Sequence, residues 1–509
     1  MANNGIGLTE SVQTKDLEMT RAVISMIAIM AVALVLTLYR LGARDVCSAN
    51  EAVEGVFVQQ MVEHGMYLFP LENGRSPMYK PPLFHWTATA IDRLIGATTV
   101  SAFNLRLPSV LYATAGVALT MLFVQGIMGT NAAVLAGLTL VGSYQYVTQG
   151  RLGRVDMTLS FFEALALFSF FWWIRRNRAG GSRSPGRATQ FVCAAALALA
   201  VLAKGPVGAI VPLAAMGIFL LAEKRLGETI RRLSPTAAIL AVLVSVSWYA
   251  ACFLNGRHSF LSRQLRSENL GRFVGTLGAM SPSYYLHPLL LNSTPLSLLV
   301  PIAVMAAVLF RTRSAAAGAG QSESEALQAV RLCGIFWLVT ALFFSVAAYK
   351  RRAYLLPLWP PAAVMLAWLV TTITARSARP NVARGYAGLC IVLVVINVVV
   401  IPRQAARACV RDSFKPAAEQ ITRVVAVDQP LYVYGFTEEL APLLFYLDRD
   451  APEIDDMLEN VPVGYVIVPA RVWENLQAQQ RDVELVLTSY GGTQPIALLR
   501  SDGAHSTQR

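Results

Sequence analysis

The sequence predicts an all-α polytopic membrane bundle with about eleven spans, followed by a small α/β C-terminal domain. Three observations predict this fold class. Of the 509 residues, 55% are hydrophobic and only 15% are charged, which leaves too little polar surface to cover a soluble globule. The mean hydropathy is +0.49. The chain also offers many apolar runs of roughly 20 residues, the length that an α-helix needs to cross a bilayer.

The apolar runs define a transmembrane domain over residues 20–401. The tail before it, residues 1–19, is polar and is expected in the cytoplasm. The first run is too long and has the wrong flanks for a cleaved signal peptide, so we expect it to remain as a span. The runs lie near residues 20–40, 103–127, 131–148, 156–174, 188–203, 205–222, 236–254, 288–310, 331–348, 354–375 and 385–401.

The basic residues predict the orientation of the bundle. With the N-terminus in the cytoplasm, the loops that fall inside are the basic segments 175–187, 223–235, 311–330 and 376–384. The positive-inside rule thus accounts for the net charge of +12, and no nucleic acid is expected as a partner. The same alternation puts residues 41–102, residues 255–287 and everything after about 402 outside.

Two of these outside segments have internal structure. The first outer loop, 41–102, carries two amphipathic helical patterns, one from about Asn50 to His64 and one after Pro81-Pro82. Such helices can frame a site where lipid head groups meet water. Residues 402–509 predict the α/β domain, because helical patterns alternate with β-prone runs at Leu431 to Tyr434, Gly464 to Val468, Val483 to Thr488 and Ile496 to Leu499.

Two carboxylates and an amide that are candidate site residues open the first outer loop. Asp45, Asn50 and Glu51 precede or begin its first amphipathic helix. An acidic group is favourable next to the unsatisfied N–H groups of a helix N-terminus, which is the structural interpretation. In the functional interpretation, a carboxylate at the mouth of a membrane cavity acts as general base on an acceptor hydroxyl or holds a divalent cation against a phosphate.

Cations gather in the same outer segments. Lys80 precedes two prolines that fix the backbone, so it is either a snorkelling lysine at a helix start or a rigidly held charge for a phosphate. Arg151 and Arg154 run against the positive-inside trend, which favours an anionic ligand. Asp156 at the start of a span is costly unless it is paired or has a function.

The most unusual cluster is the triple cation Lys350, Arg351 and Arg352, which the topology places outside. Anchoring to lipid head groups explains it less well than binding of a phosphorylated ligand. A phosphate leaving group needs cations to stabilise its negative charge, and an acceptor hydroxyl needs a base. Carboxylates and cations on one face of the bundle therefore indicate transfer from a lipid-linked phosphate donor.

An ordered set of motifs supports this interpretation. It consists of Asn50-Glu51-Ala52, Gly65, Lys80-Pro81-Pro82, Asn104 to Ser109, Gly150 to Met157, Lys204-Gly205-Pro206, Glu268 to Phe273 and Lys350 to Pro357. As a set it resembles the polyprenyl-phosphate-dependent GT-C glycosyltransferases, in particular the lipid A aminoarabinose transferases and the wider protein O-mannosyltransferase-like family. The resemblance covers roughly residues 20–400.

The resemblance implies roles for individual residues. Asn50 stands where relatives carry the Asp of an Asp-Glu-Ala triplet, so Glu51 becomes the first candidate for the base and Asp45 the reserve. Asp156, in a matching Arg-x-Asp motif, is expected to position the acceptor or the donor. The residues expected to contact the donor phosphate or lipid are Lys80, Arg154, Arg272, Lys350, Arg351 and Tyr354.

The resemblance also bears on metal binding. Aminoarabinose transferases have a Glu before the motif lysine and a His in the later loop, which can hold a metal. This chain has Tyr79 and Asn269 at those positions, which argues against that site and weakens the case for aminoarabinose as the sugar. No cofactor is certain, and the sequence leaves a divalent cation open. It also leaves open whether Cys47 and Cys409 pair.

The resemblance implies an inverting glycosyltransferase of the bacterial inner membrane. It would move a hexose or pentose from a polyprenyl-phosphate donor to a lipid, polysaccharide or protein hydroxyl on the non-cytoplasmic face, with membrane lipids as further partners. Two alternatives remain. A transporter or flippase for a lipid-linked sugar is disfavoured because mid-span positions are nearly all apolar, and an inactive homologue stays open because of Asn50. Neither the sugar, the acceptor nor the oligomeric state follows from the sequence.

Overall fold

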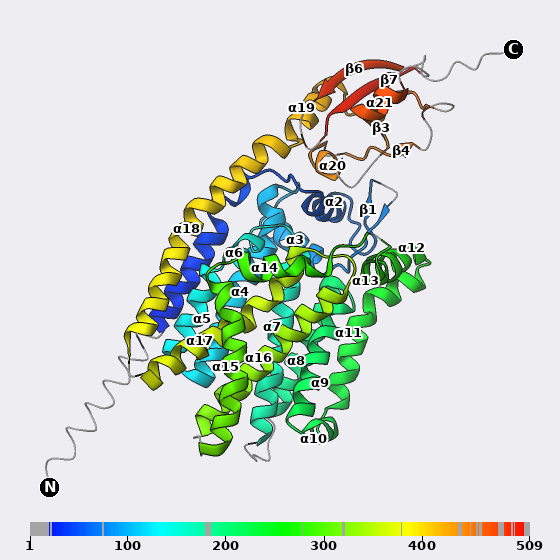
Figure 1. The fold of residues 1–509 in the computed structure, drawn as a ribbon. Coiled ribbons are helices and arrows are strands. Elements are labelled where there is room, and N and C mark those ends of the chain that lie inside the picture. Colours follow the sequence, from blue (N-terminus) through cyan, green and yellow to red (C-terminus); the bar gives the residue numbers. More distant parts are fainter. Residues whose placement is uncertain are drawn as a thin grey trace, which may run out of the picture.

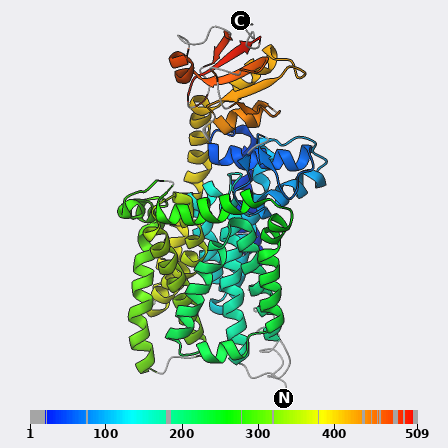
Figure 2. The ribbon, with the colours of Figure 1, turned by 90° about the vertical axis from the view of Figure 1, so that its right-hand side faces the viewer.

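The computed structural model describes residues 20, 23–73, 76–178, 185–276, 278–317, 321–377, 379–435, 440–447, 449–454, 457, 461–476, 483–489, 492 and 494–502. Its main body is a bundle of long helices, and a small sheet domain lies at one end of that bundle (Figure 1). Helices and strands that belong to the first outer loop lie between the two (Figure 2).

Within the described residues, eight helices are long and apolar enough to cross a membrane, or nine if one pair bent by 103° counts as a single span. They are Val23–Ala43, α4 (Ala102–Met128), α7 (Val155–Arg178), α8 (Pro185–Lys204), α11 (Pro235–Leu254), α16 (Gln321–Val346), α17 with the turn before it (Trp359–Ser377) and α18 (Asn381–Asp412), and the bent pair is α14 (Leu286–Leu291) with α15 (Leu296–Ala317). This confirms the predicted membrane bundle. The two remaining apolar runs form shorter helices, α5 (Thr130–Gly142) and α9 (Val207–Ala222), so a count of eleven spans stays a prediction.

The helices differ in how deeply they are buried, and this sets the centre of the bundle. The span Arg352–Ser377, which contains α17, is fully buried over its most apolar 18 residues. In α11, only 17% of the corresponding 18 residues are buried. Close packing holds the centre together. Phe123 of α4 stacks on Phe168 of α7 with 4.1 Å between ring centroids, and the Trp172 ring leaves no room for a side chain at Gly126.

The first outer loop forms α2 (Ala49–Glu63), a hairpin of β1 (Leu71–Glu72) and β2 (Ser76–Pro77), and α3 (Leu83–Leu94). Ser48 caps α2 by accepting the N–H of Glu51. Both predicted helices are present. The expected amphipathic character holds for α3, which exposes Leu94, but not for α2, where every residue from Glu51 to Met61 is buried.

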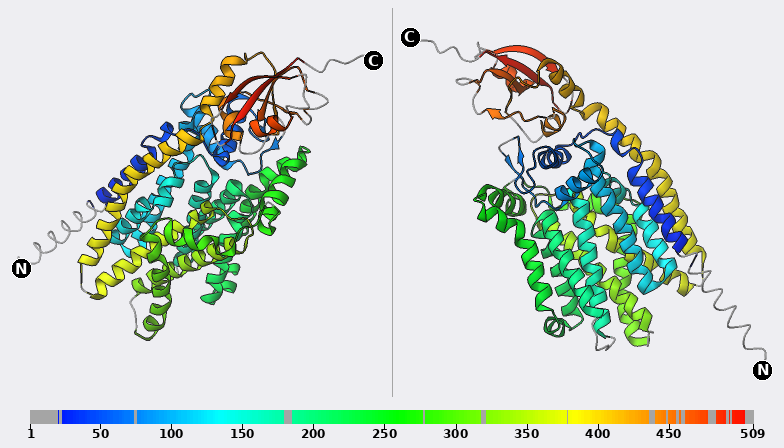
Figure 3. Two further views of the ribbon diagram at one scale, coloured as in Figure 1. Left: turned by 45° about the horizontal axis from the view of Figure 1, so that its top comes forward. Right: turned by 180° about the vertical axis from the view of Figure 1, so that it is seen from behind.

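Helix α2 is buried because the C-terminal domain covers it (Figure 3). That domain is a five-stranded mixed sheet in the order β4-β3-β5-β7-β6. Its strands are β3 (Leu431–Tyr434), β4 (Glu453–Ile454), β5 (Gly464–Pro469), β6 (Val483–Ser489) and β7 (Ile496–Ser501), and its helices are α19 (Lys415–Val424), α20 (Ala441–Leu447) and α21 (Ala470–Leu476). The α/β domain and its four predicted strands are confirmed. Helix α18 continues without a break past residue 402, where we expected the domain to begin.

Hydrogen bonds attach the sheet domain to the first outer loop. The Gln59 side chain of α2 donates to the Phe445 carbonyl of α20 over 3.0 Å. The Asn73 side chain accepts the Ala451 N–H over 2.8 Å and donates to its carbonyl. Gln60 donates to Asp450 over 3.1 Å. The sheet domain therefore holds α2 against the top of the bundle.

Candidate active site

The predicted site residues lie at the end of the bundle that carries the sheet domain, which is also the end that holds α2, α3 and α13 (Arg272–Val274) (Figure 1). They separate into two groups with different surroundings. One group is buried around α2. The other lines a cavity between α9, α16 and the segment Ser262–Gly271.

Glu51 belongs to the buried group. Its two carboxylate oxygens accept hydrogen bonds from Nε and Nη2 of Arg106, at 2.7 and 3.1 Å, and from the Gly153 N–H at 2.8 Å. Burial alone would raise the pKa of Glu51, but the charge and hydrogen bonds of Arg106 lower it overall. Glu51 is fully buried. We expected Glu51 at the mouth of a cavity, but its side chain is enclosed by protein. Its role as the base stays a prediction.

A second buried carboxylate, Glu54, lies one turn further along α2. It accepts hydrogen bonds from the Lys80 ammonium and from His85 Nε2, the latter over 2.7 Å. Burial opposes ionisation, but Lys80 and His85 together lower the pKa of Glu54 to about 2. Sequence reasoning missed Glu54 and His85. We call these contacts of Glu51 and Glu54, with Arg106, Lys80 and His85, the α2 network.

Asp156 lies at the start of α7 and is almost completely buried. Its carboxylate pairs with Lys204 Nζ at 2.5 Å and with Arg154 Nη2 at 3.1 Å. The turn after Lys204 depends on Gly205, whose φ of +95° suits glycine and where a Cβ atom would collide with the Gln264 side chain. Asp156 is thus paired, as its cost in the membrane requires.

A cavity of about 420 Å³ opens beside this pair. Three cations line it, Lys80, Lys204 and Arg272, together with Glu268 and the rings of Tyr79, Tyr349 and Tyr354. Its remaining wall is mostly apolar and consists of Pro206, Val207, Ile210, Leu265, Leu270, Phe273, Phe343, Phe344 and Ala347, with the amides of Gln264 and Asn269. We call it the cationic cavity.

The cations of this cavity are held in place by their neighbours. Arg272 donates to the Tyr354 hydroxyl over 2.9 Å and pairs with Glu268 at 2.5 Å. Burial opposes the charge of Arg272, but Tyr354 and Glu268 raise its pKa overall. Lys204 Nζ lies 4.4 Å from the centre of the Tyr354 ring. The cavity therefore presents charge that is positioned before any ligand arrives.

An apolar groove of about 750 Å³ continues from the cationic cavity. It shares Pro206, Ile210 and Leu265 with the cavity and runs between α8, α9 and α11. Helix α11 exposes Ile239, Val242 and other large apolar residues on the surface of the bundle. The groove thus follows the part of the protein that contacts lipid.

The other predicted residues lie outside the cationic cavity. Arg351 donates to the side-chain Oδ1 of Asn50 and, over 2.9 Å, to the hydroxyl of Tyr349, so it lies behind the wall of the cavity. Lys350 is buried and donates to the Ala347 carbonyl over 2.5 Å, so it stabilises the end of α16 and does not reach the cavity, contrary to our expectation. Asp45 accepts from Ser413 over 2.7 Å at the join to the sheet domain.

The structure does not decide whether a divalent cation binds, which the sequence left open. Tyr79 and Asn269 both line the cationic cavity, and Asn269 donates to the Gln264 carbonyl over 2.7 Å. Across the described residues, no three His, Cys, Asp or Glu side chains are grouped so that they could hold a metal ion. The Cys409 side chain lies outside the described residues, so whether it pairs with Cys47 stays open.

Comparisons with known proteins agree with the fold. The family described as dolichyl-phosphate-mannose-protein mannosyltransferase matches residues 79–249. An uncharacterized protein of Aquifex aeolicus is 25% identical over 349 residues, which are 68% of this chain and 64% of that protein. The undecaprenyl phosphate-α-4-amino-4-deoxy-L-arabinose arabinosyl transferase of Shewanella sediminis is 25% identical, over 66% of this chain and 57% of its own length. The chain thus spans less than two thirds of these relatives.

Solved structures share the architecture. ArnT from Cupriavidus metallidurans bound to undecaprenyl phosphate superimposes with a TM-score of 0.76 at 17% identity, covering 93% of this chain and 97% of ArnT. The archaeal oligosaccharyltransferase AglB from Archaeoglobus fulgidus, in complex with an inhibitory peptide and a dolichol-phosphate, gives 0.53 at 10% identity, covering 89% and 70%. The chain has the fold of ArnT, and its sequence resembles polyprenyl-phosphate-dependent GT-C glycosyltransferases.

Proposed function

We propose that this protein is a membrane glycosyltransferase that moves a sugar from a polyprenyl-phosphate donor to a hydroxyl group of a lipid, polysaccharide or protein. The observation that carries the proposal is the junction of the cationic cavity with the apolar groove. A polyprenyl phosphate has an anionic head and a long apolar tail, and the two spaces match these two parts in charge and polarity.

The same proposal places the cavity on the non-cytoplasmic face of a bacterial inner membrane. Helix α10 (Leu226–Arg231), in the basic loop 223–235, lies at the opposite end of the bundle from α2 and α13 (Figure 1). Basic loops favour the cytoplasmic side. The sugar would therefore be transferred at the end that carries the sheet domain.

We propose an inverting reaction in this cavity. The acceptor hydroxyl oxygen bonds to the anomeric carbon from the side opposite the phosphate, and its proton passes to a carboxylate. The bond between the anomeric carbon and the phosphate oxygen breaks, and its electron pair stays on the polyprenyl phosphate. Lys80, Lys204 and Arg272 stabilise the charge that develops there.

The candidate carboxylates for the base differ in whether a substrate in the cavity could reach them. Glu51 and Asp156 are buried, Glu51 against Arg106 and Asp156 against Lys204 and Arg154. Glu268 lines the cavity and keeps 14% of its side chain exposed. We therefore place the proton-accepting role on Glu268, which the sequence did not single out as a base, and a positioning role on Glu51, which the sequence favoured as the base.

Transfer of radiolabelled sugar tests the proposal. The full chain is reconstituted in liposomes with a labelled polyprenyl-phosphate sugar and a lipid extract as acceptor. We expect label on the acceptor with the wild type and strongly reduced label with Arg272→Gln. Arg266→Gln is the matched control, because Arg266 is exposed on the same segment and does not line the cavity.

The two alternatives give different results in the same assay. A transporter or flippase would move labelled lipid between leaflets without labelling any acceptor. An inactive homologue would do neither, although it could still bind the donor. Either result with well-folded wild-type protein would refute the proposed transfer.

A further inference from the structure

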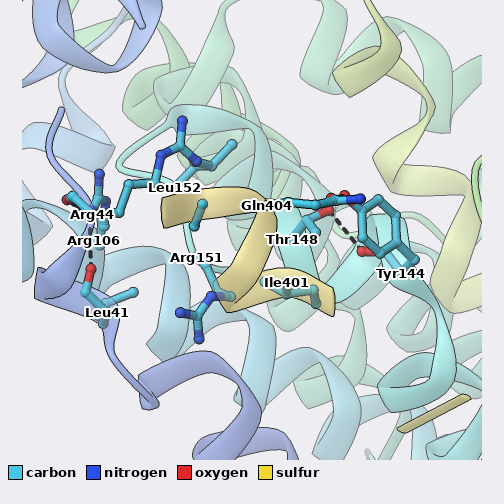
Figure 4. Close-up of a pocket in the computed structure, with 10 residues that line it drawn as sticks. Leu41, Arg44, Arg106, Tyr144, Thr148, Arg151, Leu152, Ile401 and Gln404 are labelled. Carbon is cyan, nitrogen blue, oxygen red and sulfur yellow. Dashed lines mark hydrogen bonds between the residues drawn. The ribbon is translucent and has the colours of Figure 1, made fainter. Parts of the chain in front are cut away.

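A second cavity, of about 240 Å³, lies apart from the cationic cavity and shares no lining residue with it. It is enclosed by the turn after the first span, α6 (Tyr144–Gln149), the loop 150–154 and α18 (Figure 4). We call it the arginine pocket. Its lining residues are Leu41, Arg44, Arg106, Tyr144, Thr148, Arg151, Leu152, Ile401, Gln404 and Ala405.

The pocket holds more positive than negative charge. Three arginines line it, and none of its lining residues, all of them in the described part of the chain, is acidic. Of the three, Arg106 is neutralised by Glu51. Arg151 donates to backbone carbonyls at the end of the first span, those of Leu36 at 2.5 Å and Tyr39 at 2.7 Å. These contacts position Arg151 without neutralising its full charge.

Arg44 is the arginine with the fewest contacts. Its Nε is buried and has no hydrogen-bond partner among the described residues. An unsatisfied buried donor is costly, and such a group is usually explained by a ligand or water that completes it. The side chain of Arg44 borders the pocket together with Arg106, as Figure 4 shows. An anion in the pocket would satisfy it.

The lowered pKa of Arg151 also favours an anion in the pocket. Burial lowers its pKa, and the neighbouring charges of Arg106 and Arg44 lower it further, to about 10. Three guanidinium groups thus repel one another across a partly enclosed space. Negative charge placed between them would remove that repulsion.

The surroundings of the pocket indicate a lipid and not a free ion. Leu41, Leu152, Ile401 and Ala405 contribute apolar wall beside the arginines. On the membrane side, α18 exposes Val395 and the first span exposes Val35, at 59% and 60%. A molecule held by its head group in the pocket would lay its acyl chains along these surfaces.

We propose that the arginine pocket binds the phosphate group of an anionic membrane lipid, at a site separate from the cationic cavity. The proposal rests on the charge, burial and position of the pocket and does not depend on the proposed transferase function. A free phosphate ion shares the head-group chemistry, so the test must separate the two sources.

Thermal unfolding of the full chain in detergent tests the proposal, with phosphatidylglycerol, phosphatidylcholine or inorganic phosphate added. We expect phosphatidylglycerol to raise the Tm of the wild type by several degrees and the other two additives to have little effect. Arg44→Gln should lose most of the rise and weaken phosphatidylglycerol binding at least tenfold, as measured by native mass spectrometry. Because no hydrogen bond from its Nε supports the fold, this variant should remain folded.

Arg403→Gln is the matched control. Arg403 is exposed on α18, close in sequence to Ile401 and Gln404, but does not line the pocket. It should respond to phosphatidylglycerol like the wild type. An equal rise in wild type and Arg44→Gln would overturn the proposal, as would an equal loss in both variants. A rise of the same size with inorganic phosphate would overturn the assignment to a lipid.

Discussion

The α2 network and the cationic cavity contain the same kinds of residues but place them in opposite surroundings. In the α2 network, Glu51 and Glu54 are fully buried and their partners are other protein groups. In the cationic cavity, Lys204 and Arg272 have protein partners on one side and open space on the other. A charged motif therefore indicates a ligand-binding or catalytic site only where part of its charge remains available to a ligand.

Lys80 belongs to both regions and shows how they are connected. It lines the cationic cavity, yet its ammonium is bonded to Glu54. Burial lowers the pKa of Lys80, although Glu54 opposes this. The α2 network therefore fixes the position of one cation of the cavity, and Glu54 opposes the loss of its charge.

The largest effect is expected from Arg106→Gln, which breaks the α2 network. It leaves Glu51 as an uncompensated buried charge, a change that costs about 3–5 kcal/mol. We expect a strongly lowered Tm in detergent, or protein that is not recovered folded. Arg266→Gln provides the control for loss of an arginine at an exposed site. An unchanged Tm for Arg106→Gln would show that the network is not structural.

Removal of a cation from the cationic cavity should have the opposite effect, which is a loss of transfer rate with little change in Tm. Arg272→Gln removes a preorganised cation, which for comparable charge-stabilising groups costs about 100-fold in rate. We expect that loss in transfer of labelled sugar, with a Tm close to that of the wild type. Tyr354→Phe, which removes only the hydrogen bond to Arg272, should lose less. Full activity in Arg272→Gln would remove this residue from the proposed donor site.

Two carboxylate variants sharpen the comparison further. We expect Glu51→Gln to lower the Tm, because it weakens the bidentate contact with Arg106, and to reduce activity through loss of folded protein. Glu268→Gln should remain stable and lose transfer activity per folded molecule. The measurement is turnover normalised to protein that elutes as a single folded species. If the normalised losses are reversed, Glu51 is the base, as the sequence favoured.

The smallest effect concerns pH. The pKa of Glu54 is about 2 in the folded state, below its ordinary value of 4.5. A carboxyl with a lowered pKa contributes stability that is present above pH 4.5 and is lost as the pH falls towards 2. We expect the Tm of the wild type to fall over this range more steeply than that of Glu54→Gln. Parallel pH profiles would contradict the role of Glu54 in the network.

The sequence predicted those parts of the molecule that depend on neighbouring residues. Apolar runs and alternating strands are local patterns, so the spans and strands such as Leu431–Tyr434 could be located. The outer segments that contribute Lys80, Arg272 and Tyr354 were also recognised, and the structure brings these three residues to one cavity.

Pairing between distant residues could not be predicted in the same way. Glu54 binds Lys80 across 26 positions and Asp156 binds Lys204 across 48, and no local pattern reveals such partners. Lys350 was misplaced for a related reason. Its motif position indicated a phosphate contact, but its side chain turns back to the Ala347 carbonyl, just after the end of α16. Charge type is visible in a sequence, whereas the direction of a side chain is not.

The two attachments of the sheet domain limit how substrates can enter. Helix α18 runs as one piece from the bundle to that domain, and α20 is hydrogen-bonded to α2 on the other side. A domain attached at one point can rotate away from the bundle, whereas a domain attached at two points is held in a fixed position. We therefore expect a lipid to reach the cationic cavity from the side, through the apolar groove that shares Pro206, Ile210 and Leu265 with it.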